Sequence, residues 1–539
     1  MVICGAHGYE ELVTHRIWRT QACRFAEAGL PTLRFDYLGT GDSVGADDDA
    51  GRVPAWLESV RLAVAALRSH TGVDEVILVG FRLGAMLAAL AAETIDGIEG
   101  VALVAAPTTG AAYVRQMRVL ARMAAPIENA PPTPPEWKDD VEMGGSFLTA
   151  ETIAALETLD LMKLPRRPAR RVLLFNRPDL PPDTRLADRL EELGAIVQGD
   201  TLKGYRDMVR FAPHLCRSPE DDMIRLTEWA RAGAAHRSGA TAAMVPPGRI
   251  ELPEAVETPV RFGPNGKLFG IRCQPRRPST RMPILFLNTG ANRHIGTCRF
   301  TVMLARRLAA HGFPSWRIDL AGIGDSDAMP GQPDHVLDSM ASCVDVYAAL
   351  DMLESEGYGR CIAVGLCSGA HLAFVCARHD SRLARLVLVN PQMFDLRDAE
   401  TKGLRTWLWR MWRDMLHGKA KWPALLPPAL RRAGKAVVAF VGDRGALWPS
   451  RRGERNAVAK WFRRLGERGV RILLVYSPQD YGLSAAEIYL GPRDGIEAAF
   501  PNIALRVVEG TDHTMTRRWA REHLAALLEE ELLGDTLPA

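Results

Sequence analysis

Three residue types that together can carry out acyl transfer lie far apart in this 539-residue chain. Cys367 stands in the middle of a Gly-x-Cys-x-Gly sequence, Asp480 follows a late apolar run, and His513 lies near the C-terminus. A thiol beside an imidazole can ionise to the nucleophilic thiolate, and a carboxylate on the other ring nitrogen fixes the tautomer of the imidazole. These groups can react together only if the fold brings them to one place.

The surroundings of Cys367 occur twice, which indicates a tandem duplication. An Asp-x-x-Gly-x-Gly-Asp-Ser sequence begins at Asp36 and again at Asp319. A Gly-x-x-x-Gly sequence begins 44 residues after the first, at Gly80, and 46 residues after the second, at Gly365. The period of about 285 residues is that of a whole domain and far exceeds the repeat of a solenoid or propeller.

Continuous apolar runs alternate with amphipathic stretches in each half, which predicts parallel sheets with helices on both faces. In the second half we expect strands at 284–287, 315–318, 361–364, 386–389, 471–475 and 504–508, with helices that include 299–310, 337–355 and 369–378. A hairpin around Asn265-Gly266 is expected before them. The first half lacks this hairpin, so either its domain is trimmed or its start codon has been placed too late.

The length and composition predict two globular domains, at 1–235 and 257–539, joined by a linker at 236–256. Hydrophobic residues make up 47% and charged residues 24%, which excludes a mainly disordered, collagen-like or coiled-coil chain. The 67 basic and 64 acidic side chains nearly balance, and this argues against a nucleic-acid partner that covers the whole surface. The oligomeric state stays open.

The nine cysteines are odd in number and include no Cys-x-x-Cys pair. This pattern favours reduced thiols over a disulfide framework or a zinc site. The longest apolar-looking run, around 83–92, is too short to span a bilayer. We therefore expect a soluble cytoplasmic protein with no transmembrane segment, no metal and no cofactor.

These motifs resemble the α/β-hydrolase superfamily, particularly its serine aminopeptidase and lipase-like branch. The resemblance rests on the Asp-x-x-Gly-x-Gly-Asp-Ser turn, the Gly-x-nucleophile-x-Gly elbow, a late acid and a later histidine, and it covers nearly all of both halves. It implies an α/β fold of two tandem α/β-hydrolase domains, each a mostly parallel, doubly wound sheet with a helical cap insertion.

The resemblance also implies a triad in which Cys367 is the nucleophile, His513 the base and Asp480 the orienting acid, in the chain order of the superfamily. Most of the family has serine at the position of Cys367. The backbone N–H of Ser368, with one from the Ala291-Asn292 segment, would form the oxyanion hole.

Two alternatives to this assignment remain. Ser368 could be the nucleophile, although Leu366 would then stand where a small residue belongs. Asp512 could replace Asp480, although neighbouring residues on a tight loop rarely aim correctly. The polar residues of the second turn, Asp319, Asp325 and Ser326, are expected to brace that turn by hydrogen bonds.

The first half departs from the pattern at the nucleophile, where Arg82 stands. A guanidinium stays protonated and cannot attack a carbonyl. Spacing identifies Asp179 and His214 as counterparts of the acid and base, since they are 35 residues apart and the other pair 33. This half therefore resembles a pseudoenzyme, in which Arg82 either belongs to a scaffold or holds a carboxylate or phosphate.

A basic segment with several tryptophans, at about 392–465, falls where the superfamily carries its cap. From 397 to 464 it holds 17 Lys or Arg against 5 Asp or Glu. It could form an acyl tunnel whose rim, with Trp407, Arg410 and Arg413, attracts an acyl carrier protein or coenzyme A. It could equally be a solvated helical cap, or a surface for an anionic membrane or a nucleic acid.

Two classes of function follow. The first is a cysteine-dependent acyl-transfer enzyme that hydrolyses an ester or thioester, or passes the acyl group to an acceptor, through an acyl-thioester on Cys367. Cysteine at the elbow is also found in dienelactone hydrolases and polyhydroxyalkanoate synthases, so both outcomes are compatible with it. The second is a non-catalytic scaffold built from two decayed hydrolase domains.

Overall fold

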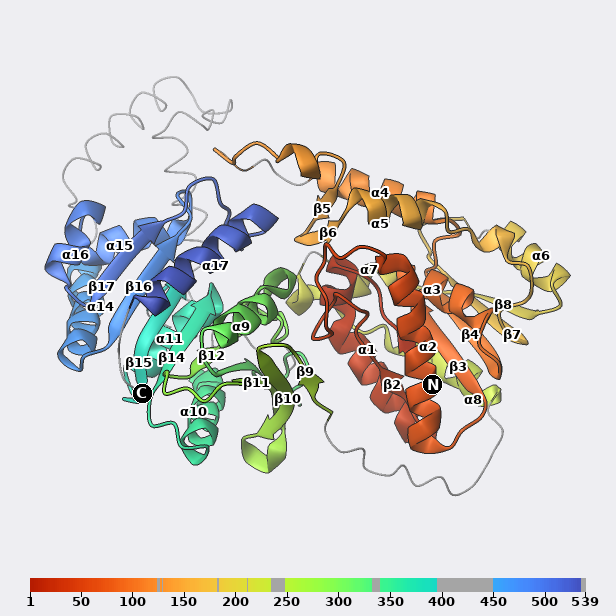
Figure 1. Ribbon diagram of the computed structural model, residues 1–539, viewed down its shortest axis with the longest axis horizontal. Coiled ribbons are helices and arrows are strands. Elements are labelled where there is room, and N and C mark those ends of the chain that lie inside the picture. Colours follow the sequence, from red (N-terminus) through yellow and green to blue (C-terminus); the bar gives the residue numbers. More distant parts are fainter. Residues whose placement is uncertain are drawn as a thin grey trace.

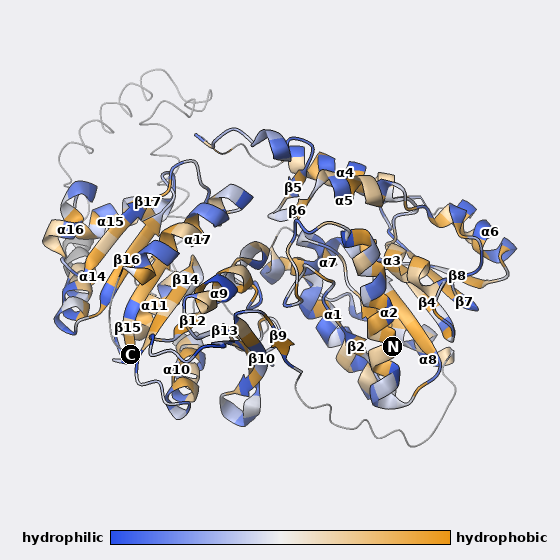
Figure 2. Cartoon of the chain, viewed as in Figure 1, coloured by the Kyte–Doolittle hydropathy of each residue, from blue (hydrophilic) through white to orange (hydrophobic). Residues whose placement is uncertain are grey.

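The computed structural model describes residues 1–123, 127, 129–181, 184–210, 212–233, 248–331, 340–394 and 449–534. Its two large sheets lie side by side, one in each half of the chain, with helices around both (Figure 1). The central strands of both sheets are predominantly apolar, whereas many helices carry both polar and apolar residues (Figure 2). The chain is therefore an α/β protein.

The first half contains a six-stranded sheet in the order β2-β1-β3-β4-β7-β8, and all its neighbouring strands are parallel. Its strands are β1 (Val2–Cys4), β2 (Leu33–Arg34), β3 (Val76–Phe81), β4 (Ile98–Val104), β7 (Arg171–Asn176) and β8 (Ile196–Thr201). Its helices are α1 (Tyr9–Glu27), α2 (Arg52–Thr71), α3 (Leu83–Ala92), α4 (Gly110–Met123), α5 (Ala150–Glu157), α6 (Thr184–Glu192), α7 (Tyr205–Met208) and α8 (Glu220–Ala232). A separate hairpin joins β5 (Val141–Met143) to β6 (Ser146–Leu148).

The second half contains a nine-stranded mixed sheet in the order β17-β16-β15-β14-β12-β13-β11-β10-β9. Its strands are β9 (Ile250–Glu251), β10 (Ala255–Phe262), β11 (Leu268–Pro275), β12 (Ile284–Phe286), β13 (Ser315–Asp319), β14 (Cys361–Leu366), β15 (Leu383–Val389), β16 (Arg471–Tyr476) and β17 (Ile503–Val507). Its helices are α9 (Phe300–Ala310), α10 (Met340–Ser355), α11 (Ser368–Ala377), α14 (Pro449–Glu467), α15 (Tyr481–Leu490), α16 (Ile496–Ala499) and α17 (Arg518–Leu533). The expected strands and helices of this half are confirmed to within a few residues at each end.

The expected hairpin is also confirmed, as the antiparallel pair β10 and β11. Its turn holds Asn265 at φ 54° and Gly266 at φ 64°, a conformation that Asn and Gly adopt more readily than other residues. The remaining six strands, in the order β13-β12-β14-β15-β16-β17, repeat the order of the six strands of the first half. The likeness between the motifs of the two halves therefore extends to their strand order.

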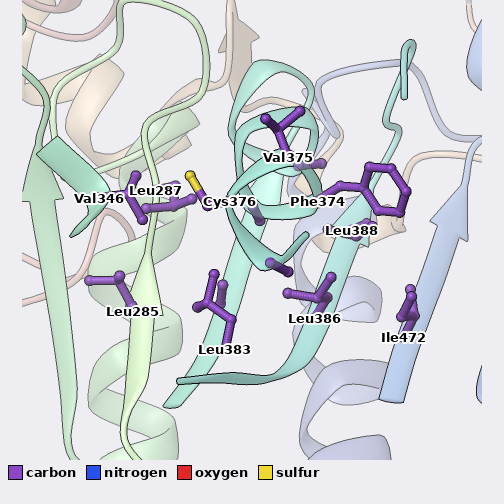
Figure 3. Close-up of a cluster of buried hydrophobic side chains, with 14 of the residues drawn as sticks. Leu285, Leu287, Val346, Phe374, Val375, Cys376, Leu383, Leu386, Leu388 and Ile472 are labelled. Atoms are coloured by element: carbon purple, nitrogen blue, oxygen red, sulfur yellow. The ribbon is translucent and has the colours of Figure 1, made fainter. Parts of the chain in front are cut away.

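The central strands of the sheet in the second half are buried on both faces, and apolar side chains pack against them. Every residue of β14 and β15 is buried. Leu285, Leu386 and Phe374 belong to the core cluster on one face, where α11 packs on the strands (Figure 3). The elbow that follows β14 thus stands on a rigid, close-packed base.

The sequence boundaries shift in two places. Residues 250–256, expected in the linker, contain β9 and the start of β10 and so belong to the second sheet. The end of the expected cap is a core element, because Val458, Phe462 and Leu465 of α14 are buried in the main cluster. No helix in the described part of the chain is long and apolar enough to cross a membrane.

Candidate active site

Cys367 occupies a sharp turn between β14 and α11. Its backbone has φ 56° and ψ −115°, a conformation that side-chain-bearing residues rarely adopt. The two glycines make this turn possible, since a Cβ on Gly365 would lie 2.2 Å from the backbone of Gly369, and one on Gly369 would lie 2.6 Å from the Asn288 carbonyl oxygen. The thiol is held half-buried at the end of the sheet by local backbone geometry.

His513 and Asp480 meet at the same end of the sheet. Asp480 follows β16 and His513 follows β17, and these two strands are neighbours in the sheet. The Nδ1 atom of His513 hydrogen-bonds the Oδ2 atom of Asp480. The other carboxylate oxygen, Oδ1, accepts the backbone N–H of Gly482 at 2.7 Å, so Asp480 also caps α15. The carboxylate is buried and held at both oxygens.

The electrostatics of His513 depend on both proposed partners. Burial lowers the pKa of His513, but the hydrogen bonds with Asp480 and with Cys367 outweigh it and raise the pKa to about 10. The imidazole is therefore stabilised in its protonated form by both Asp480 and Cys367. At neutral pH this environment favours an imidazolium between two groups that can carry negative charge.

The rival residues are engaged elsewhere. Asp512 accepts the backbone N–H of Thr516 at 2.6 Å, in the turn that leads into α17. The Ser368 hydroxyl oxygen accepts the N–H of Gly290 at 2.7 Å. The geometry thus joins His513 to Asp480 rather than to Asp512, and it ties the Ser368 side chain to the loop after β12.

That loop, residues 287–299, is the segment expected to supply the second oxyanion donor. The N–H of Asn292 donates to the Thr289 carbonyl oxygen at 3.1 Å within a turn, so this amide is already used. Ala291 is buried beside it, next to the Gly290 contact with Ser368. Of the two expected residues, Asn292 is therefore the one whose N–H is engaged within the loop.

Sequence reasoning did not single out the polar residues that support the histidine loop. Asn390 follows β15 with φ 47° and donates through Nδ2 to the His513 carbonyl oxygen at 2.8 Å. The Ser477 hydroxyl donates to the Asp512 carbonyl oxygen at 2.7 Å, and Thr511 donates to Ser477 at 2.8 Å. A polar residue directly after a buried strand was the available signal, and Asn390 and Ser477 both have it.

The elbow of the first half has the same backbone and a different occupant. Arg82 has φ 55° and ψ −120°, and its side chain is buried. Its guanidinium donates to Glu10 Oε1 at 2.6 Å, to Gln116 Oε1 at 2.6 Å and to the Ala105 carbonyl oxygen at 3.2 Å. The chain's own acceptors therefore occupy the place where an external carboxylate or phosphate would bind.

The expected counterparts of the acid and base in the first half, Asp179 and His214, differ in their surroundings from Asp480 and His513. Asp179 follows β7, as Asp480 follows β16, but it pairs with Arg177 at 2.7 Å. His214 lies in a short 3₁₀ turn, thirteen residues after the end of β8, whereas His513 follows the end of β17 by six residues. The structure does not unite Arg82, Asp179 and His214 into a second triad. The predicted carrier-site residues, Trp407, Arg410 and Arg413, lie outside the described residues.

One described group has the spacing of a metal site, formed by His294, Asp319 and Asp325. Both ring nitrogens of His294 hydrogen-bond carboxylates, Asp319 Oδ2 at 2.7 Å and Asp42 Oδ2 at 2.6 Å. Burial lowers the pKa of His294, but these two carboxylates raise it to about 10. In the structure both ring nitrogens are thus engaged by carboxylates, and the group forms an ion-pair cluster.

Comparisons with known proteins bear on the second half. The family of serine aminopeptidase, S33, matches residues 280–435. No curated protein matches the sequence.

Among solved structures, a Pyrococcus furiosus esterase is 13% identical over 52% of this chain and 92% of its own, with a TM-score of 0.34. A putative dienelactone hydrolase from Klebsiella pneumoniae is 12% identical over 52% and 99%, with a TM-score of 0.32. Mouse alpha/beta hydrolase domain-containing protein 10 is 13% identical over 54% and 99%, with a TM-score of 0.30. The family match makes the C-terminal half of the chain similar to the α/β-hydrolase superfamily, in its serine aminopeptidase-like branch.

Proposed function

We propose that the C-terminal half is a cysteine-dependent acyl-transfer enzyme, which hydrolyses an ester or thioester or passes its acyl group to an acceptor. The observation that carries the proposal is the set of contacts around His513. Its ring bonds the buried carboxylate of Asp480, its pKa is raised by both Asp480 and Cys367, and Cys367 stands on a sharp turn at the end of the sheet.

The reaction would proceed in two steps. The Cys367 thiolate attacks the acyl carbonyl carbon, a C–S bond forms, the bond to the leaving group breaks, and the His513 imidazolium gives its proton to that group. Water or another acceptor then attacks the thioester carbon and gives its proton to His513. The C–S bond breaks and the thiolate returns. The N–H groups of Ser368 and Ala291 would stabilise the oxyanion in both steps.

Cysteine suits this environment because the imidazolium stabilises a thiolate before substrate binds. A serine alkoxide would instead need its proton removed during attack. The raised pKa of His513 supports the imidazolium of such an ion pair.

For the first half we propose a second α/β-hydrolase domain that has lost its nucleophile. Its sheet has the same strand order, and the backbone angles of Arg82 match those of Cys367 within a few degrees. Arg82 is an internal ion-pair partner in this proposal, because Glu10 and Gln116 already use its donors.

The substrate would be an acyl ester or thioester in a reducing cytoplasm, delivered by an acyl carrier protein or coenzyme A. The support for a carrier is the net positive charge of residues 397–464, since cations at the mouth of a cleft concentrate anionic ligands.

The test uses a small activated ester and an acyl-coenzyme A thioester, with intact mass spectrometry to detect the acyl adduct. Cys367→Ala should abolish both turnover and the adduct, and Cys367→Ser should leave a weak hydrolase. The matched control is Cys23→Ala, because Cys23 is an exposed free thiol far from the elbow in sequence. Turnover and an adduct that persist in Cys367→Ala would refute the proposal and leave the non-catalytic scaffold.

A further inference from the structure

The loop that carries Ala291 is held by residues of the other half of the chain. Arg293, two residues after Ala291, donates through Nη2 to Asp36 Oδ1 at 2.9 Å and lies 3.1 Å from Glu11 Oε1. His294, the next residue, bonds Asp42 at 2.6 Å. Both side chains are buried, so these contacts are shielded from solvent and salt.

His294 forms a clamp between the two Asp-x-x-Gly-x-Gly-Asp-Ser turns. Its Nε2 bonds Asp42 of the first turn and its Nδ1 bonds Asp319 of the second. The Asp42 carboxylate also accepts Arg317 Nη2 at 3.0 Å. Removing one charge of this buried cluster would leave the other charges uncompensated, which is energetically costly. The cluster therefore holds the two turns in their positions at His294.

The backbone of the first turn completes the attachment. Arg299, at the end of the same loop, donates to the carbonyl oxygens of Gly41 at 2.7 Å and Gly45 at 2.6 Å. Arg306 of α9 donates to the Asp42 carbonyl oxygen at 2.6 Å. The carboxylates and carbonyl oxygens of the first turn thus accept hydrogen bonds from the loop 287–299 and from the neighbouring helix α9.

The first half also contacts the histidine side of the site. Glu142, in β5, accepts the backbone N–H of Arg518 at 2.5 Å, at the start of the helix that follows His513. A Cβ on Gly510, in the histidine loop, would lie 2.4 Å from the Asn129 carbonyl oxygen. The segments on both sides of the sulfur therefore touch the first half.

We propose that the N-terminal half is a positioning domain for the C-terminal active site. Its turn, residues 36–45, holds the loop 287–299 so that the N–H of Ala291 points at the developing oxyanion. The inference rests on the acyl-transfer function proposed above. It explains what a half without a nucleophile contributes: Asp36 and Asp42 are positioning residues that act through Arg293 and His294.

The test compares Asp36→Asn and Asp42→Asn in the full chain. Losing one oxyanion donor lowers kcat about 10²- to 10³-fold, so a displaced loop should lower kcat for a small neutral ester by at least about 10-fold, with little change in KM. Alkylation of Cys367 by iodoacetamide forms no oxyanion and should keep its wild-type rate. The matched control is Asp327→Asn, which breaks the contact between the halves at Arg19 without touching the loop.

Each outcome of this experiment either supports or overturns the positioning role of the N-terminal half. A lower kcat in both loop variants, with alkylation and the control unchanged, supports the proposal. An unchanged kcat in folded variants overturns it, as does an alkylation rate that falls in step with kcat. If Asp42→Asn does not fold, Asp36→Asn decides, with Asp36→Glu expected to restore activity through Arg293. Failure of the acyl-transfer function itself would appear in the wild-type chain, as no ester turnover and no acyl adduct on Cys367.

Discussion

The hydrogen bond between Asp480 and His513 allows a quantitative test by Asp480→Asn. Asparagine keeps the size of the side chain and removes its charge. Burial lowers the pKa of His513, and the Asp480 contact is the first of those that raise it to about 10. In the variant the pKa should fall toward its ordinary value of 6.5. At pH 8 the protonated fraction would then decrease from about 99% toward about 3%.

When His513 loses this proton, the proposed Cys367 thiolate loses its positively charged partner. The proposed ion pair predicts that the rate of Cys367 alkylation by iodoacetamide in the wild-type protein is nearly flat from about pH 6.5 to about pH 9. In Asp480→Asn the rate should rise with pH as it does for a free thiol. At about pH 7 it should be slower by up to about 30-fold, since only about 3% of an ordinary thiol is then ionised.

The control is Asp512→Asn, which makes the same change on the carboxylate beside His513. Asp512 accepts from Thr516, so its alkylation profile should match that of the wild type. A flat profile in Asp480→Asn would show that Asp480 does not govern the pair. A changed profile in Asp512→Asn would give Asp512 that role instead.

Three further predictions concern stability and the carrier. Arg82→Met should lower the free energy of unfolding by about 3–5 kcal/mol, because Glu10 is left buried without its partner. Adding Glu10→Gln should restore most of this loss in urea titrations, and an equal loss in both variants would contradict the reasoning. The pKa of His294 is raised to about 10, so the stability it contributes is complete below about pH 6.5 and is lost as pH rises through 10. Between these values the free energy of unfolding should fall by about 1.4 kcal/mol per pH unit from this group, and His294→Gln should remove that slope. For a carrier-bound substrate kcat/KM should drop steeply with salt while a small neutral ester stays almost indifferent, and equal dependence would remove the carrier.

Local sequence predicted the parts of the fold that depend on neighbouring residues. Apolar runs marked the buried strands β14 and β15, since a parallel sheet covered on both faces needs no polar alternation. The paired glycines predicted the turn at Cys367, because only small residues fit where the strand, the turn and the helix approach each other. Asn265-Gly266 predicted the hairpin for a similar reason of backbone conformation.

Contacts between residues far apart in the chain could not be predicted from the local sequence. The sequence favoured Asp480 as the acid and left Asp512 as an alternative, because the contact depends on the pairing of β16 with β17 and on the turn at Thr516. Spacing identified Asp179 and His214 as counterparts of the acid and base, but it gave no indication that Glu10 of α1 is a partner of Arg82. It assigned α14 to a cap, although Phe462 of that helix packs in the core.

The sequence by itself predicted the α/β class, the repeated motifs of the two halves, the turn between two glycines at Cys367 and the order of cysteine, aspartate and histidine along the chain. These follow from residue type and short spacing, which the local backbone obeys. Only the tertiary structure decided which side chains meet. In the sequence the two Asp-x-x-Gly-x-Gly-Asp-Ser turns are far apart and show no sign of contact. In the structure His294 joins Asp42 of one turn to Asp319 of the other. Burial at the contact between the halves makes these charges depend on one another, and burial is a property of the packed molecule alone.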